Sequence, residues 1–140
     1  MVIPGTIAEV LGALTLRAQL DLRTELRELR VAADAMLVAV WLVDSGRTEL
    51  LEYAGDRTLL PTPLPQITSS VPTFEPIRCR DHDEHPGVVH ALRIGRGMPA
   101  AGLLLVDAHL PPPRLVDEVE GAGARAEKII VRALEPSPKR

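Results

Sequence analysis

The chain has 140 residues, 46% hydrophobic and 25% charged, which is enough for one domain with a hydrophobic core and too few for two ordinary domains. A net charge of −3 and only three aromatic residues (Trp41, Tyr53 and Phe74) exclude a basic nucleic-acid surface, a base-stacking platform and attraction to anionic membranes. A single cysteine excludes an internal disulfide. No basic residue precedes Arg17, as a secretory signal would require, and no stretch of about 18 apolar residues is present. We therefore expect a soluble, cytoplasmic protein.

Residues 6–31 are predicted to form the first helix, because Thr6 and Glu9 have the spacing of a capping box. Apolar residues then follow three-four spacing on one stripe: Ile7, Leu11, Leu14, Ala18, Leu22, Leu26 and Leu29. A second apolar set lies off that stripe: Val10, Ala13, Leu16 and Leu20. The second set predicts a second contact surface, on another helix of the domain or on a second subunit. The Arg/Glu run from Arg23 to Arg30 is interpreted as a solvated helix face.

Two strand hairpins are predicted, one over 35–56 and one over 88–107. The unbroken apolar run from Ala35 to Val43 favours a strand buried on both faces, and a Ser-Gly turn and a second strand follow it. The second hairpin turns at the Gly-Arg-Gly of residues 95–97.

Between the hairpins, residues 57–87 contain six prolines, which disfavour long regular elements. We expect an irregular excursion there, with a short edge strand near 73–79. After the second hairpin, a proline run precedes an apolar stripe that predicts a helix over 112–134.

The element order is therefore helix, hairpin, irregular excursion, hairpin, helix. This order predicts a single α+β domain over 1–140, an antiparallel sheet with the N- and C-terminal helices packed on one face.

Two stretches resemble a GAF domain. MLVAVWLVDSGRTELLEYAGD is similar to the opening strand, acidic turn and second strand of that family, and VVHALRIGRGMPAAGLLLVDAHLPPP is similar to the paired strands before its last helix. The resemblance implies a ligand pocket over the face opposite the helices, a sensory or regulatory role, and dimerisation through the terminal helices. The chain departs from the family in its middle, which is short and rich in proline where the family builds the pocket lid from helices.

The candidate ligand-pocket residues are Trp41, Tyr53, Phe74 and His90. For Trp41 and Tyr53 the alternative is that the aromatic rings fill the core, and for His90 it is a hydrogen-bonded structural role. No catalytic motif is present, so we expect neither an enzyme nor a bound cofactor.

Cys79, His82 and His85 together form a possible zinc ligand set. All three lie within seven residues, and no second ligand cluster exists to complete the coordination. We therefore interpret 79–85 as an acidic surface loop and predict no metal site.

We thus expect a GAF-like regulatory domain in signal transduction or transcription control that forms a homodimer, with a small molecule or a signalling protein as further partner. Three alternatives stay open: a ligand-free interaction module of the same fold, a metal- or redox-responsive sensor using the 79–85 loop, and a roadblock/longin-type scaffold for a small GTPase.

Overall fold

The computed structural model describes residues 6–44, 47–60, 75–78, 88–94, 100–109 and 112–134, and for 75–78, 88–94, 100 and 112 it describes the backbone. The helices are α1 (Ile7–Ala13), α2 (Leu16–Ala33) and α3 (Pro112–Leu134), with a short 3-10 helix, η1 (Arg57–Leu59). The strands are β1 (Leu37–Asp44), β2 (Arg47–Gly55), β3 (Glu75–Arg78), β4 (Val88–Ile94) and β5 (Ala100–Val106). The fold is α+β with helices at both ends of this part of the chain, as the element order predicts.

The five strands form one antiparallel sheet in the order β2-β1-β5-β4-β3. Both expected hairpins are present: β1 pairs with β2, and β4 pairs with β5. The short strand β3 lies at one edge, and β2 forms the other. Strand β1 is buried on both faces along nearly its whole length, because it pairs on both sides and lies between two hydrophobic clusters.

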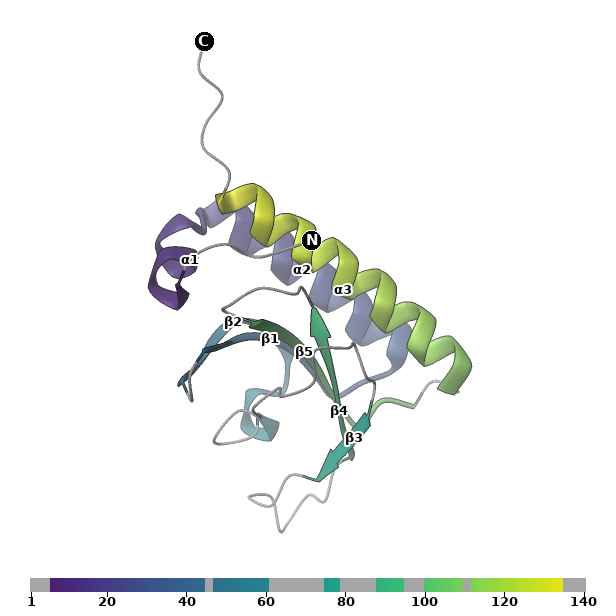
Figure 1. Cartoon of the computed structure of the whole chain (residues 1–140). Helices are drawn as coiled ribbons and strands as arrows, with labels where there is room; N and C mark the ends of the chain where they lie inside the picture. Colours follow the sequence, from purple (N-terminus) through teal and green to yellow (C-terminus); the bar gives the residue numbers. More distant parts are fainter. Residues whose placement is uncertain are drawn as a thin grey trace.

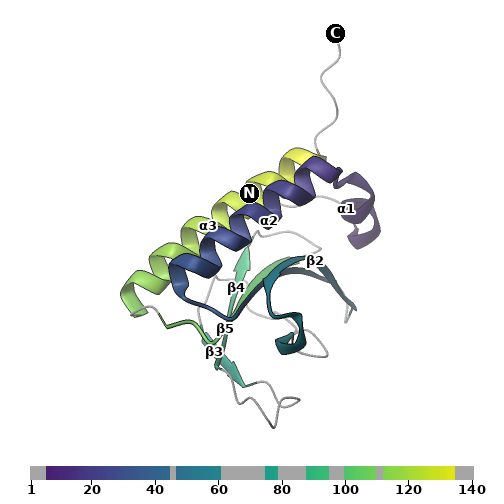
Figure 2. The same cartoon turned by 180° about the vertical axis from the view of Figure 1, so that it is seen from behind.

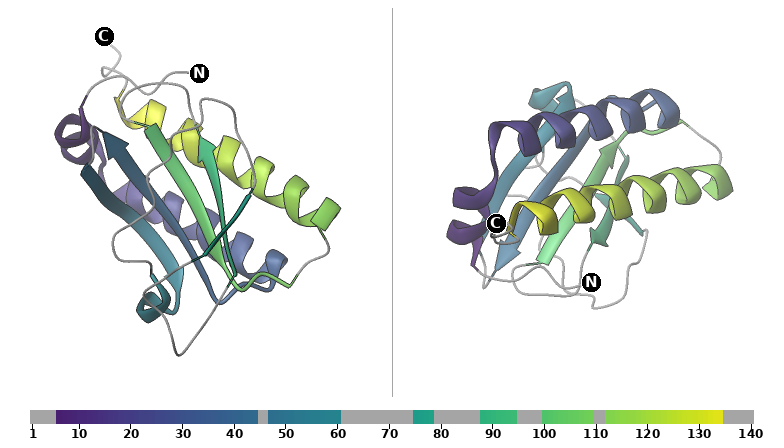
Figure 3. Two further views of the ribbon diagram at one scale, coloured as in Figure 1. Left: turned by 60° about the horizontal axis from the view of Figure 1, so that its bottom comes forward. Right: turned by 90° about the horizontal axis from the view of Figure 1, so that it is seen from above.

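The helices lie on one face of the sheet (Figure 1). Helices α2 and α3 run side by side in opposite directions across this face, and α1 lies beside the end of α3 (Figures 2 and 3). An ion pair also joins the two long helices, with Nε of Arg125 on α3 donating to Oε2 of Glu25 on α2 at 2.7 Å.

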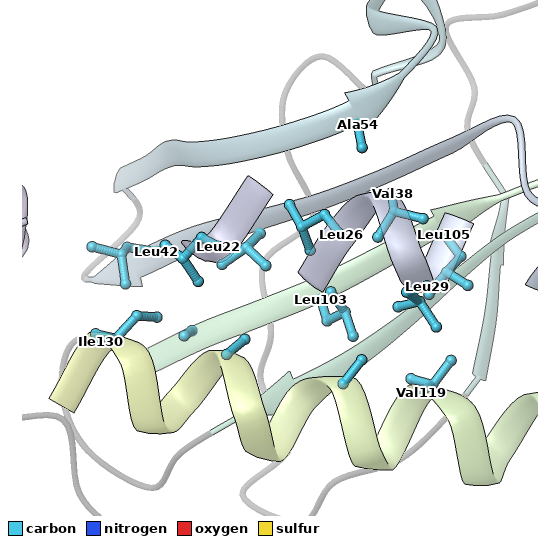
Figure 4. Close-up of a cluster of buried hydrophobic side chains, with 14 of the residues drawn as sticks. Leu22, Leu26, Leu29, Val38, Leu42, Ala54, Leu103, Leu105, Val119 and Ile130 are labelled. Atoms are coloured by element: carbon cyan, nitrogen blue, oxygen red, sulfur yellow. The ribbon is translucent and has the colours of Figure 1, made fainter. Parts of the chain in front are cut away.

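The helix-side core is a cluster of buried aliphatic side chains between the helices and the sheet (Figure 4). Helices α2 and α3 contribute Leu22, Leu26, Leu29, Val119 and Ile130, and the strands contribute Val38, Leu42, Leu103 and Leu105. Complete burial of each large side chain stabilises the fold by about 1.5–3 kcal/mol.

The single helix expected over 6–31 is instead two helices, which is a correction to the sequence prediction. Leu14 has an extended backbone, with φ −69° and ψ 108°, and its side chain is buried. Thr15 then begins α2, because its hydroxyl oxygen accepts a hydrogen bond from the backbone N–H of Ala18 at 3.1 Å. Thr6 caps α1 as predicted, through the N–H of Glu9.

The break also changes which apolar side chains reach the core. Leu11, expected on the buried stripe, is 40% exposed, whereas Val10 of the second set is fully buried. Two other members of the second set, Leu16 and Leu20, are exposed on α2.

Candidate functional site

Trp41 lies on the face of the sheet opposite the helices, where the resemblance implies a pocket. Its side chain is completely buried in a cluster with Leu37, Ala39, Val43, Leu59, Leu104 and Val106. Leu59 belongs to η1, so the 3-10 helix folds against this face. In the described part of the chain, Trp41 is therefore a core residue packed among aliphatic side chains.

Tyr53 is next to this cluster on the edge strand. It pairs with Ala39 in the sheet and is partly buried against the same side chains. The guanidinium of Arg57 lies 5.6 Å from the centre of its ring, a cation–π distance that joins η1 to β2. Tyr53 and Trp41 thus share one face of the sheet.

The strand register does not place His90 opposite the residues of the Trp41 cluster. The register pairs His90 with Leu105, which belongs to the helix-side cluster, and not with Leu104 or Val106 of the Trp41 cluster. Phe74 lies outside the described residues, and so does the loop 79–85 with Cys79, His82 and His85. Among the described residues, no group of three or more His, Cys, Asp or Glu side chains has the arrangement of a metal site.

A cleft of about 560 Å³ lies where α2 overhangs the edge strand β2. Arg23, Arg27 and Arg30 line it from the helix, at spacings of four and three residues that place them on one helix face. Glu52, Tyr53, Ala54 and Gly55 line it from the strand, and Val31 completes it. The cleft thus has three guanidinium groups and one carboxylate among its lining side chains.

Glu52 is the buried carboxylate at the strand side of the cleft, with 8% of its surface exposed. Its Oε2 accepts from Nη2 of Arg23 at 3.3 Å, and its Oε1 accepts from the backbone N–H of Tyr53 at 3.1 Å. A buried carboxylate needs such partners, because desolvation penalises the charged form. Arg23 is therefore neutralised locally, while no carboxylate of the described residues lies within 4 Å of Arg27 or Arg30.

Gly55, the last residue of β2, sets the shape of the cleft at that end of the strand. Its φ is +105°, a conformation that side chains rarely adopt, and an added Cβ would collide with the carbonyl oxygen of Met36. The same Cβ would lie 2.9 Å from Cδ of Arg30. Nη1 of Arg30 also reaches the carbonyl oxygen of Ala35 at 3.5 Å. Arg30 is therefore held across the end of β2.

A second hollow of about 510 Å³ adjoins the cleft and shares Arg30 and Gly55 with it. Its other lining residues include Asp34, Asp56 and His109. Nδ1 of His109 lies 3.0 Å from the carbonyl oxygen of Asp34, and the backbone N–H of His109 donates to Ala33 at 3.0 Å. Because two carboxylates line this hollow, it is less favourable to an anion than the adjoining cleft with its three arginines.

The sequence contained the arginine spacing, but the interpretation of residues 23–30 as a solvated helix face is incomplete. Arg27 is exposed, as that interpretation requires, yet all three arginines face a cleft against β2. Glu52 and Gly55 lie beside these arginines only because the sheet order makes β2 the edge strand next to α2.

No model of a known protein family matches the sequence, and a comparison with curated proteins also finds no match. Within the residues that the structure describes, no helix has the length and apolar character needed to cross a membrane.

Proposed function

We propose that the chain is a GAF-like regulatory domain that acts as a homodimer through its N-terminal helical segment. The support for the class is the antiparallel sheet with the first and last helices on one face, which is the architecture that the sequence resemblance implies. In such a domain the helical layer passes a signal to the partner subunit or to a downstream protein.

The observation that carries the homodimer is the exposure of Leu16 and Leu20. They lie one turn apart on α2, so they share a face, and they are 73% and 48% exposed. The described part of α2 already buries a separate stripe against the sheet and α3. An apolar pair outside that stripe is typical of a helix that contacts a second protein surface.

A second copy of the chain is the occupant that fits this surface best. Leu16 and Leu20 are flanked by Arg17 and Asp21, which are exposed and of opposite charge. Across a two-fold axis between antiparallel helices, a contact of Arg17 with Asp21 of the partner subunit is repeated by Asp21 with Arg17 of the partner subunit. The leucines then pack together while the two charges pair across the interface.

Sedimentation velocity tests this proposal with a pair of variants. The wild-type chain should sediment at twice its mass of 15.2 kDa at micromolar concentration, and the double variant Leu16→Asp, Leu20→Asp should sediment as a monomer. The control is Val31→Asp, because Val31 is 74% exposed but lies near the other end of α2. A wild-type monomer, or a dimer that survives the double substitution, would count against the proposal.

A ligand-free interaction module of the same fold is a second candidate, and the packing around Trp41 favours it. The face where the resemblance implies a pocket is filled, in its described part, by Trp41 and its aliphatic neighbours. Native mass spectrometry of freshly purified protein distinguishes a ligand-sensing domain from a ligand-free interaction module. A reproducible bound mass supports sensing, and a ligand-free dimer supports the interaction module.

A further inference from the structure

We propose that the cleft between α2 and β2 binds the phosphate group of a small phosphorylated molecule. This site is on a different surface from the pocket that the family resemblance implies, and the inference does not rest on dimerisation.

The lining of the cleft carries an excess of positive charge. Among the described residues, three guanidinium groups and one carboxylate line the cleft, which leaves a formal surplus of two positive charges in a protein whose net charge is −3. Like charges at three- and four-residue spacing on a helix repel one another. Glu52 relieves this repulsion at Arg23 only. An anion bound between Arg27 and Arg30 would relieve the rest.

The geometry suits a phosphate in particular. Guanidinium groups offer paired N–H donors that match two oxygens of a phosphate, and such charge-assisted hydrogen bonds are the stronger ones. Arg30 is held in place by Gly55 and the carbonyl of Ala35. Arg23 is held by Glu52. Arg27 lies between them on the same helix face and has no carboxylate partner among the described residues. Its guanidinium is therefore the group that would bind the phosphate most directly.

The size of the cleft points to more than an inorganic ion. Small-molecule sites commonly enclose about 300–1,000 Å³, and this cleft has about 560 Å³. Val31 and Ala54 provide apolar surface beside the arginines. The neighbouring hollow carries Asp34 and Asp56, which repel an anion. The phosphate therefore belongs at Arg27 and the organic part of the ligand against Val31 and Ala54.

Calorimetric titration with two probes tests the inference on the full chain. Phenyl phosphate and inorganic phosphate share the charged group, but only the first has an organic part. We expect both to bind the wild-type protein, with phenyl phosphate at least threefold tighter. Equal affinities would mean that the cleft takes the free ion, and would overturn the assignment of an organic phosphate.

Three variants locate the binding. Arg27→Gln should weaken phenyl phosphate binding about tenfold, since one charged hydrogen-bonding group is lost. Glu52→Gln removes the one carboxylate that the described residues contribute to the cleft and should strengthen binding severalfold. Arg114→Gln, exposed on α3 and outside the cleft, should leave the affinity unchanged.

The single tryptophan, Trp41, reports through its fluorescence whether each variant is folded. The inference is overturned if neither probe binds at millimolar concentration, if Arg27→Gln binds as well as wild type, or if Arg114→Gln weakens binding as much as Arg27→Gln. The same titration on the Leu16→Asp, Leu20→Asp variant should give wild-type affinity, so a failure of the proposed dimer would not be mistaken for a failure of the site.

Discussion

The side-chain stem of Arg30 lies against the backbone of Gly55, so close that a Cβ at position 55 would be 2.9 Å from Cδ of Arg30. This contact joins the last turns of α2 to the end of the edge strand. It depends on a residue without a side chain, because Gly55 has a φ of +105° and faces the carbonyl oxygen of Met36.

Gly55→Ala should therefore destabilise the protein by at least about 2 kcal/mol, from the strained backbone together with the collision at Met36. Urea denaturation followed by Trp41 fluorescence measures the change. The matched control is Gly12→Ala in α1, where an added Cβ meets nothing within 4 Å and alanine favours the helix by about 0.5–1 kcal/mol. Equal effects of the two substitutions would contradict this account of Gly55.

Asp34 ends α2 in a left-handed conformation, with φ 49° and ψ 50°. Glycine is the residue best suited to such a helix end. Asp34→Gly should stabilise the protein by about 0.5–1 kcal/mol, because the Asp34 side chain is 86% exposed and its contact with His109, at 4.0 Å, is weak. Asp34→Ala should instead lower stability, since alanine has the side-chain strain without the local hydrogen bonding of aspartate. Denaturation midpoints that move the same way in both variants would argue against this reading.

The cap at Thr15 holds the start of α2. Thr15→Ala should reduce the free energy of unfolding by about 1 kcal/mol, because the N–H of Ala18 loses its acceptor. Thr15→Ser keeps the hydroxyl and should retain most of that stability. If alanine and serine are equivalent at this position in thermal denaturation, the hydroxyl does not cap the helix.

The ion pair between Arg125 and Glu25 should make a small contribution to stability that does not change from about pH 6 to pH 10. The hydrogen bond to Glu25 raises the pKa of Arg125 above its ordinary value. A raised pKa stabilises the fold at every pH below the unfolded value, and this contribution is lost only as the pH rises through the still higher folded value.

The size of that contribution is set by exposure. Arg125 is 54% exposed, so solvent screening limits the loss in Glu25→Gln to about 0.2–1 kcal/mol. Denaturation of wild type and variant at three pH values within that range checks both statements. A difference between them that grows or vanishes across the range would contradict the assignment.

Much of the fold was predictable because its elements have strong local patterns. The apolar run through Trp41 predicts a strand buried on both faces, and the proline run at residues 111–113 marks the start of α3. The break before Thr15 was missed because its residues continue the helical spacing, and Leu14 reaches the core from an extended backbone instead.

The cleft depends on information that the sequence pattern does not carry. The three arginines were visible at helical spacing, but their neighbour across the cleft depends on which strand lies at the sheet edge. Leu51 is also left out of the register between Val40↔Glu52 and Trp41↔Leu50, a bulge that no local pattern indicated. The pairing of Arg23 with Glu52 follows from tertiary structure alone.

The homodimer through α2 is the central claim, and cross-linking between subunits tests it most directly. In a Cys79→Ser background the chain has no other cysteine, so Leu20→Cys introduces one reactive thiol at the proposed interface. A short bis-maleimide should then give a covalent dimer in high yield, while Arg114→Cys, exposed in the first turn of α3 and so at the opposite end of the helix pair, should stay monomeric under the same conditions. A covalent dimer from Leu20→Cys alone is the predicted result; no covalent dimer, or equal yields from the two positions, would contradict the claim.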